Sequence, residues 1–194
     1  CWEAVKHAKQ NRIHTFIGTS PLHRAIPHPT KDEMAERLHE TVSHARNLCD
    51  NVQWSPMDAT RTELDYLYRV VEIAIKAGAT TINIPDTVGY TAPRESADLI
   101  AKLLENVPGA DEIVFATHCH NDLGMATANS LAAGEAGARQ IECTINGLGE
   151  RAGNTALEEV VMALKVRNDS MPFETRVDSR KIMNISRRVA AVSG

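Results

Sequence analysis

Five short runs rich in β-branched residues recur along this chain of 194 residues, and a helical pattern follows each of them. The runs are residues 12–17, 52–55, 80–84, 113–117 and 140–145. Their starts are spaced near the ~30 residues of a β-α-β unit. Strict alternation of strands and helices implies a parallel sheet covered by helices. This alternation restricts the possible folds more than any other feature of the sequence.

The helical patterns between the runs carry their own start and stop signals. Apolar residues recur every three or four positions at 34–48, 64–75, 97–104, 123–136 and 161–166. Thr30 with Glu33, and Thr155 with Glu158, match the capping box that opens a helix. Gly78 is typical of a helix end, as is the pair at 108–109. Residues 178–192 predict one further helix.

Two parallel α/β folds fit this alternation, and the loops after the strands separate them. No GxGxxG sequence or phosphate-binding loop follows a run, so a nucleotide-binding doubly wound sheet loses support. A (β/α)8 TIM barrel is the better prediction. Five strand–helix units are visible, so a complete barrel requires about three more. We therefore expect an incomplete barrel.

Composition narrows the possible partners and the compartment. Hydrophobic residues make up 43% of the chain and charged residues 24%, which is typical of a globular domain. Only 4% of residues are aromatic and the net charge is -4, which disfavours nucleic-acid binding. The sequence has no apolar run of membrane-spanning length, no signal peptide and no Cys-x-x-Cys pair. We expect a cytoplasmic protein with reduced thiols, and a fragment, because the chain lacks an initiator Met and stops within a helical pattern.

Two histidines, one residue apart, follow the fourth run. Side chains alternate along a strand, so His118 and His120 can direct both imidazoles to one point. In parallel α/β folds this end of the strands holds the active site. The pair predicts part of a metal site, and imidazoles with carboxylates nearby suit Mn, Mg, Zn or Fe. A third ligand is required, and the alternatives are Asn154 or an acidic residue outside the chain.

A glycine-rich loop, residues 146–154 (NGLGERAGN), follows the fifth run. Its loop-structuring residues are Gly147, Gly149, Glu150, Arg151 and Gly153. Three glycines beside a charged pair indicate a shaped loop instead of a plain turn. The charged pair fits a structural ion pair, and the asparagine that ends the loop fits a helix cap as well as a metal ligand.

Other polar residues lie at the same end of the predicted sheet. His14 lies in the first run, Ser55 ends the second and Thr87 follows the third. Taken singly, His14 fits a packed, hydrogen-bonded histidine, and the other two fit turn formers. Asp122 most simply caps the next helix. Their common position nevertheless predicts that the chemistry of the chain gathers at one rim.

Four segments together resemble the 2-isopropylmalate synthase family, in the metal-dependent Claisen-condensing branch of the DRE-type TIM barrels. The segments are 12–21 (RIHTFIGTSP), 81–90 (TINIPDTVGY), 118–124 (HCHNDLG) and 146–154 (NGLGERAGN). The last two are specific in this order and spacing. The resemblance implies the last five units of a TIM barrel over residues 1–168. It also implies a linker and the start of a helical subdomain over residues 169–194.

The resemblance also implies a role for several residues. His118 and His120 correspond to metal ligands and Asn154 to a further one, with Mn expected and Mg or Zn possible. Residues His14, Ser55 and Thr87 match positions that contact a 2-keto acid. The family's Arg-Asp pair on the first strand and a catalytic His from the partner subunit lie outside this chain. A homodimeric parent protein is therefore expected, and the chain alone is expected to be inactive.

The implied reaction condenses acetyl-CoA with 3-methyl-2-oxobutanoate, giving 2-isopropylmalate and CoA, the first committed step of leucine biosynthesis. One departure concerns Met57, where family members often have a Glu that has been proposed to serve in catalysis. Methionine cannot transfer a proton, so Asp58 is a weak catalytic candidate and the main acid and base are expected outside the chain.

Alternatives of three kinds stay open: related synthases, a related lyase and a non-catalytic remnant. Homocitrate and citramalate synthases share the His-x-His motif and the barrel. Hydroxymethylglutaryl-CoA lyase is expected to have a cysteine in the glycine loop, which residues 146–154 lack. The third alternative is an inactive truncated metal-binding remnant, which the methionine at position 57 favours.

Overall fold

The computed structural model describes residues 1–25 and 30–194. In this part of the chain, five parallel strands form one sheet in the order β1-β2-β3-β4-β5. They are β1 (Ile13–Gly18), β2 (Val52–Met57), β3 (Thr81–Asp86), β4 (Val114–Cys119) and β5 (Gln140–Glu142). Each predicted strand is therefore confirmed. The spatial order equals the chain order, as in a barrel, whereas a doubly wound sheet reverses direction at its switch point.

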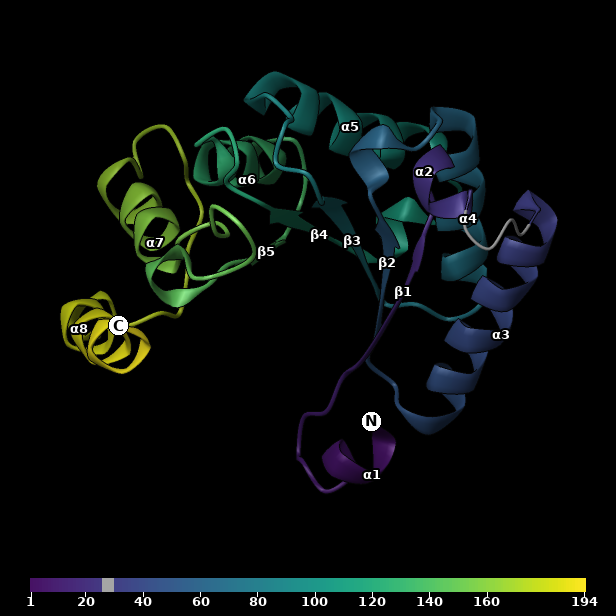
Figure 1. Cartoon of the computed structure of the whole chain (residues 1–194), viewed down its shortest axis with the longest axis horizontal. Coiled ribbons are helices and arrows are strands. Elements are labelled where there is room, and N and C mark those ends of the chain that lie inside the picture. The colour runs from purple at the N-terminus through teal and green to yellow at the C-terminus, as the bar shows by residue number, and fades with distance from the viewer. Residues whose placement is uncertain (26–29) are drawn as a thin grey trace.

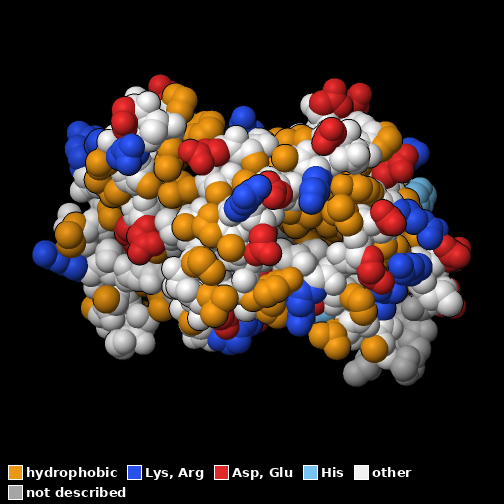
Figure 2. Space-filling view, turned by 90° about the horizontal axis from the view of Figure 1, so that it is seen from above, with side chains coloured by type: hydrophobic (Ala, Val, Ile, Leu, Met, Phe, Trp, Pro, Cys, Tyr) orange, Lys and Arg blue, Asp and Glu red, His pale blue; other side chains and the backbone are white. Residues whose placement is uncertain are grey.

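Helices α3 to α6 lie along the outer side of the curved sheet, whereas α8 lies away from it, as Figure 1 shows. The longer ones are α3 (Lys31–Leu48), α4 (Leu64–Lys76), α5 (Pro93–Asn106), α6 (Ala126–Glu135), α7 (Leu157–Val166) and α8 (Ile182–Ser193). The short elements are α1 (Trp2–Val5), α2 (Pro21–Arg24), η1 (Ala59–Arg61), η2 (Ala110–Glu112), η3 (Ile145–Gly147) and η4 (Ser179–Lys181). Figure 2 shows acidic and basic side chains interspersed with apolar ones on the face seen from above.

The two faces of the sheet differ in chemistry, because alternate residues of a strand point to opposite faces. The outer face packs against the helices through buried apolar side chains: Ile13, Val52, Trp54, Ile82, Ile84 and Phe115. The strand register places a polar set on the inner face: His14, Gln53, Ser55, Asn83, His118 and Glu142. The hydrophobic core therefore lies between sheet and helices, and the reactive side chains face the concave side.

One predicted helix cap is present and two are wrong. Thr30 and Glu33 form the predicted capping box of α3. Helix α7 begins at Leu157 without a side-chain cap, because Thr155 is buried and its hydroxyl donates to the Ala126 carbonyl at 3.2 Å. Helix α6 begins at Ala126, whose N–H donates to Asn121 and not to the predicted cap Asp122. At both ends, contacts across the fold replace the local hydrogen bonds that the sequence pattern favours.

The C-terminal part contains the predicted final helix. A short turn, η4, leads into α8, which lies beside η3. The Asn146 amide donates to the Ser186 carbonyl at 3.0 Å, so α8 is attached to the start of the glycine-rich loop. Within the described ranges, none of the helices has the length and apolarity needed to cross a membrane. The division of the chain at residue 168 stays a prediction.

Candidate active site

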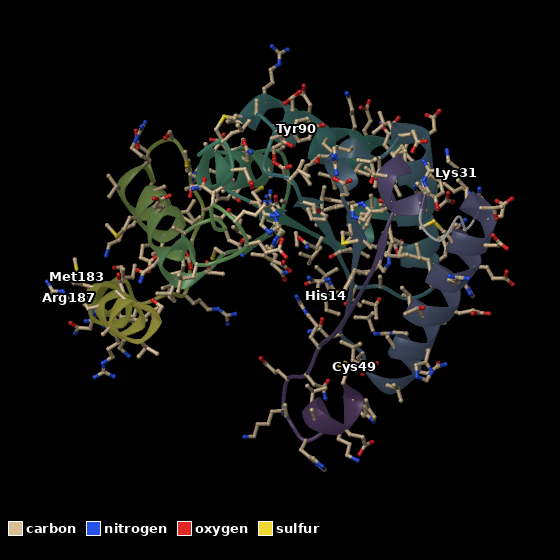
Figure 3. All side chains as sticks on the ribbon, viewed as in Figure 1. His14, Lys31, Cys49, Tyr90, Met183 and Arg187 are labelled. Atoms are coloured by element: carbon tan, nitrogen blue, oxygen red, sulfur yellow. The ribbon has the colours of Figure 1, made fainter. Side chains whose placement is uncertain are left out.

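A cavity of about 400 Å³ lies on the inner face at the carboxyl ends of the strands. Every strand contributes to its wall, and so does the glycine-rich loop. The described lining residues are His14, Phe16, Ser55, Met57, Asn83, Pro85, Thr87, His118, His120, Glu142, Gly149, Glu150 and Asn154. The labelled His14 lies on the concave side of the sheet in Figure 3. All six residues predicted to contact metal or keto acid therefore line one cavity.

The two histidines of the fourth strand end face each other. Their Nε2 atoms are 3.1 Å apart, and the ring planes meet at 78°. His118 Nδ1 lies 3.0 Å from Glu142 Oε2, and His120 Nδ1 lies 2.6 Å from the Thr87 carbonyl oxygen. A carboxylate and a carbonyl can only accept, so each Nδ1 carries the hydrogen. Both Nε2 atoms then present lone pairs to the space between them.

A nearby arginine shares the carbonyl acceptor of the His120 ring. Arg151 Nη2 donates to the Thr87 carbonyl at 2.8 Å and lies 3.0 Å from His120 Nδ1. Guanidinium is only a donor, so its contact with a protonated Nδ1 is not a hydrogen bond. The carbonyl oxygen has two lone pairs and accepts from both neighbours. The arginine and the histidine are thus held by one backbone acceptor.

The arrangement fits a divalent metal ion. Two nitrogens about 2.1 Å from one ion and at a right angle lie about 3.0 Å apart, close to the spacing of the two Nε2 atoms. Asn154 pairs with His120 in an antiparallel bridge, and its Oδ1 is buried without a partner among the described residues. An orphaned amide oxygen on a residue that lines the same cavity is a suitable third ligand. Within residues 1–25 and 30–194, no three His, Cys, Asp or Glu side chains cluster at a metal-binding spacing.

Glycines give the loop its close approach to this site. A side chain at Gly149 would place Cβ 2.3 Å from Asn154 Oδ1, so only glycine leaves the amide in place. Gly153 has a φ of +102°, and a Cβ there would lie 2.3 Å from the Gly147 carbonyl oxygen. Gly147 itself has a φ of +64°. The three glycines therefore fold the loop back so that its last residue reaches the histidines.

The charged residues of the loop attach it to the end of β4. Arg151 donates to both oxygens of Asp122 at 2.7 and 2.8 Å. These hydrogen bonds hold the pKa of the Asp122 carboxyl below its ordinary value. The predicted Glu150–Arg151 contact exists at 3.1 Å, but both side chains are largely exposed. The ion pair with Asp122 and the bond to the Thr87 carbonyl are thus the stronger anchors of the loop.

The residues matched to keto-acid contacts form a second group in the cavity. His14 Nε2 lies 2.7 Å from Ser55 Oγ, and Asn83 Nδ2 donates to the same hydroxyl at 3.1 Å. Burial lowers the pKa of His14, so the ring is neutral near pH 7. Ser55 accepts from the amide and shares a second hydrogen bond with His14 Nε2, whose donor depends on the tautomer of the ring. The Thr87 hydroxyl is less available to a keto acid, because it accepts a hydrogen bond from the Asp58 N–H at 2.9 Å.

Asp58 has a different environment from the cavity residues. Its side chain is 0% exposed and accepts from Arg61 Nη2 at 2.7 Å, and His23 Nδ1 lies 3.3 Å away. Burial raises the pKa of Asp58, but hydrogen bonds from Arg61 and Ser20 outweigh it and leave the pKa below its ordinary value. Asp58 is absent from the described lining of the cavity. This placement favours a structural role, and Met57 is the side chain of that segment that reaches the cavity.

Glu142 is the residue of the site that sequence reasoning missed. Its carboxylate accepts from His118, from Gln53 at 2.5 Å and from Asn83 at 3.3 Å. Burial raises the pKa of Glu142, but the hydrogen bonds from His118 and Gln53 outweigh it and lower the pKa. The available signal was that Gln140 and Glu142 flank Ile141 in strand alternation. A charged inward position at the end of a strand is a sign of the active rim.

A family model and several curated proteins match this chain over nearly its whole length. A family model described as HMGL-like matches residues 2–189. The chain is 57% identical to 2-isopropylmalate synthase of Caulobacter sp. (strain K31) over 197 residues, covering 100% of this chain and 37% of that protein. It is also 57% identical to 2-isopropylmalate synthase of Methylobacterium nodulans over 192 residues, covering 98% and 37%. The chain thus spans little more than a third of these relatives.

Solved structures share the fold. Hydroxymethylglutaryl-CoA lyase from Pseudomonas aeruginosa superposes with a TM-score of 0.80 at 22% identity, covering 100% of this chain and 66% of that chain. The HMG-CoA lyase from Brucella melitensis gives 0.77 at 25% identity, covering 98% and 70%. These lyases are TIM barrels, so the predicted fold class, an incomplete (β/α)8 barrel, is confirmed.

Proposed function

This chain belongs to the HMGL-like family, and from that premise we propose that it supplies the metal and keto-acid part of a 2-isopropylmalate synthase active site. The observation that carries the proposal is the pair of facing Nε2 atoms, 3.1 Å apart, in a cavity that Asn154, with its orphaned amide oxygen, also lines. His14 and Ser55 lie in the same cavity. A divalent ion and a small 2-keto acid are the ligands that this chemistry suits.

The chain's own residues would bind and orient the reactants. His118, His120 and Asn154 would hold the ion, with Mn preferred and Mg or Zn as alternatives. When bound, the ion supplies Lewis acidity to the carbonyl and carboxylate of a keto acid. The neutral His14 ring and the Ser55 hydroxyl would hydrogen-bond the keto acid, and the loop tied by Arg151 would cover it.

The proposed reaction joins the methyl carbon of acetyl-CoA to the carbonyl carbon of 3-methyl-2-oxobutanoate. A base removes one methyl proton, the new carbon–carbon bond forms while the carbonyl oxygen takes up a proton, and water then cleaves the thioester to release CoA and 2-isopropylmalate. Met57 cannot remove a proton, and the Asp58 carboxylate is bound to Arg61. We therefore assign the base to a part of the parent protein outside this chain. A cytoplasmic homodimer acting in leucine biosynthesis belongs to the same proposal.

The substrate preference is a testable consequence. No Lys or Arg is among the described residues that line the cavity, so a second carboxylate has no cationic partner there. We expect the native polypeptide that contains this chain to prefer 3-methyl-2-oxobutanoate over 2-oxoglutarate and pyruvate by at least about tenfold in kcat/KM, which corresponds to about 1.4 kcal/mol. The measurement is the release of free CoA from acetyl-CoA with each keto acid.

Each of the other possible results of this measurement would point to one of the alternative functions. A preference for 2-oxoglutarate would replace the proposal with homocitrate synthase, and a preference for pyruvate would replace it with citramalate synthase. Metal binding without CoA release from any of the three would favour the inactive remnant. A matched control with the metal removed by chelation separates metal-dependent turnover from background thioester hydrolysis.

A further inference from the structure

We infer that Glu142 is a positioning residue, which fixes the nitrogen that His118 presents to the cavity. The inference rests on the metal site of the proposed function, but it does not depend on which keto acid is condensed. Glu142 ends β5, and its Oε2 lies 3.0 Å from His118 Nδ1. Both side chains are mostly buried, at 28% and 24% exposure, so water competes little for this contact.

The partners of Glu142 leave it only one way to bind His118. Gln53 Nε2 donates to Oε1 at 2.5 Å, and Asn83 Nδ2 donates to Oε2 at 3.3 Å. A carboxylate that receives donors on both oxygens acts as an acceptor towards its third partner as well. His118 must then donate from Nδ1, which leaves the lone pair on Nε2. The hydrogen bond on one ring nitrogen decides which nitrogen is free to bind a metal.

The amide that holds Glu142 has a fixed orientation too. Gln53 Oε1 accepts from Arg12 Nη1 at 2.6 Å and from Gln140 Nε2 at 2.9 Å. Two donors on the amide oxygen force the Nε2 end towards the carboxylate. Arg12 also donates to Gln140 Oε1 at 2.7 Å, which ties the residue before β1 to β5. A continuous chain of hydrogen bonds therefore runs across the inner face from the Arg12 guanidinium to His118.

Replacing the Glu142 carboxylate should disturb this chain of hydrogen bonds without removing a ligand of the metal ion. In Glu142→Gln, the two amide donors would compete for one oxygen, and the new NH2 group would face His118 Nδ1 or Gln53. We expect Mn2+ affinity to fall about 10- to 100-fold, as is typical when a partner of a metal-binding histidine is lost. The share of His118 with its hydrogen on Nδ1 should also fall in the metal-free protein. Glu135→Gln, on an exposed position of α6, is the matched control and should change neither quantity.

Two measurements on the native polypeptide test the inference: Mn2+ titration followed by electron paramagnetic resonance, and 15N spectra of the histidine rings without metal. Glu142→Asp keeps the charge but shortens the side chain by one methylene group. Weakened Mn2+ binding in Glu142→Asp supports positioning, whereas wild-type affinity would mean that charge alone matters and would overturn it. This variant also carries the test if Glu142→Gln does not fold.

Failure of the inference can be told from failure of the proposed function. Wild-type affinity and an unchanged His118 tautomer in Glu142→Gln would overturn the inference, even if the enzyme condenses acetyl-CoA as proposed. Loss of Mn2+ affinity together with the tautomer change would support it, even if no keto acid is turned over by the wild-type protein.

Discussion

Replacing His118 or His120 with alanine is expected to lower the affinity for Mn2+ by more than about 100-fold and to abolish metal-dependent CoA release. The loss of a direct ligand should exceed the effect of losing one of its hydrogen-bond partners, which is about 10- to 100-fold. Each alanine removes one of the two Nε2 atoms that face each other at 3.1 Å. The remaining ring and the Asn154 amide are too few ligands for tight binding.

The measurement is metal content after dialysis, together with turnover of acetyl-CoA and 3-methyl-2-oxobutanoate. His39→Ala is the matched control, because this histidine lies exposed on α3 and should leave metal content and rate unchanged. Thermal unfolding of each variant checks that the fold survives. Full metal occupancy and normal rates in both His118→Ala and His120→Ala would remove the assignment of the site.

The second large effect concerns stability. Asp58→Asn is expected to lower the free energy of unfolding by about 2 kcal/mol, because the buried carboxylate accepts charge-assisted hydrogen bonds from Arg61. Asparagine tolerates the left-handed backbone at this position, where φ is 65°, so the change isolates the loss of charge. The Arg61 side chain is 33% exposed and stays solvated, which limits the penalty.

This effect should depend on pH in a defined direction. The pKa of Asp58 lies below its ordinary value of 3.8 in the folded chain, so its contribution to stability is present above pH 3.8. The contribution is lost as the pH falls through the folded-state pKa. Urea unfolding of wild type and Asp58→Asn should therefore differ at pH 7 and converge in strong acid. A large loss of turnover with unchanged stability would instead make Asp58 a catalytic acid or base.

The barrel could be predicted from the sequence because its signals are local. The five strands and the longer helices show their periodicity within short stretches of sequence, and the alternation then selects a parallel sheet. The convergence of His118 and His120 was predictable for the same reason, since alternation on one strand fixes which side chains share a face. The position of the glycine-rich loop followed from its place after the last strand.

Partners from distant segments could not be predicted. Asp122 matched a helix cap, but Arg151, 29 residues later, binds it in the folded chain. The Thr155 hydroxyl matched a capping box, but burial against α6 gave it other partners. Glu142 lies at the end of a strand of only three residues, where the alternation is a weaker signal than in the longer strands. These choices depend on which side chains the curved sheet brings together, and no local pattern specifies that.

The central claim is that one ion binds to the facing histidines and holds the keto acid in this cavity. Pulsed electron paramagnetic resonance of Mn2+ tests it directly in the native polypeptide, with 15N-labelled histidine and 3-methyl-2-oxobutanoate carrying 13C in its carboxylate. We expect coupling of Mn2+ to two imidazole nitrogens, and a 13C coupling that appears when the keto acid is added. Mn2+ coupled to water alone, or to histidine with no 13C signal from the keto acid, would contradict it.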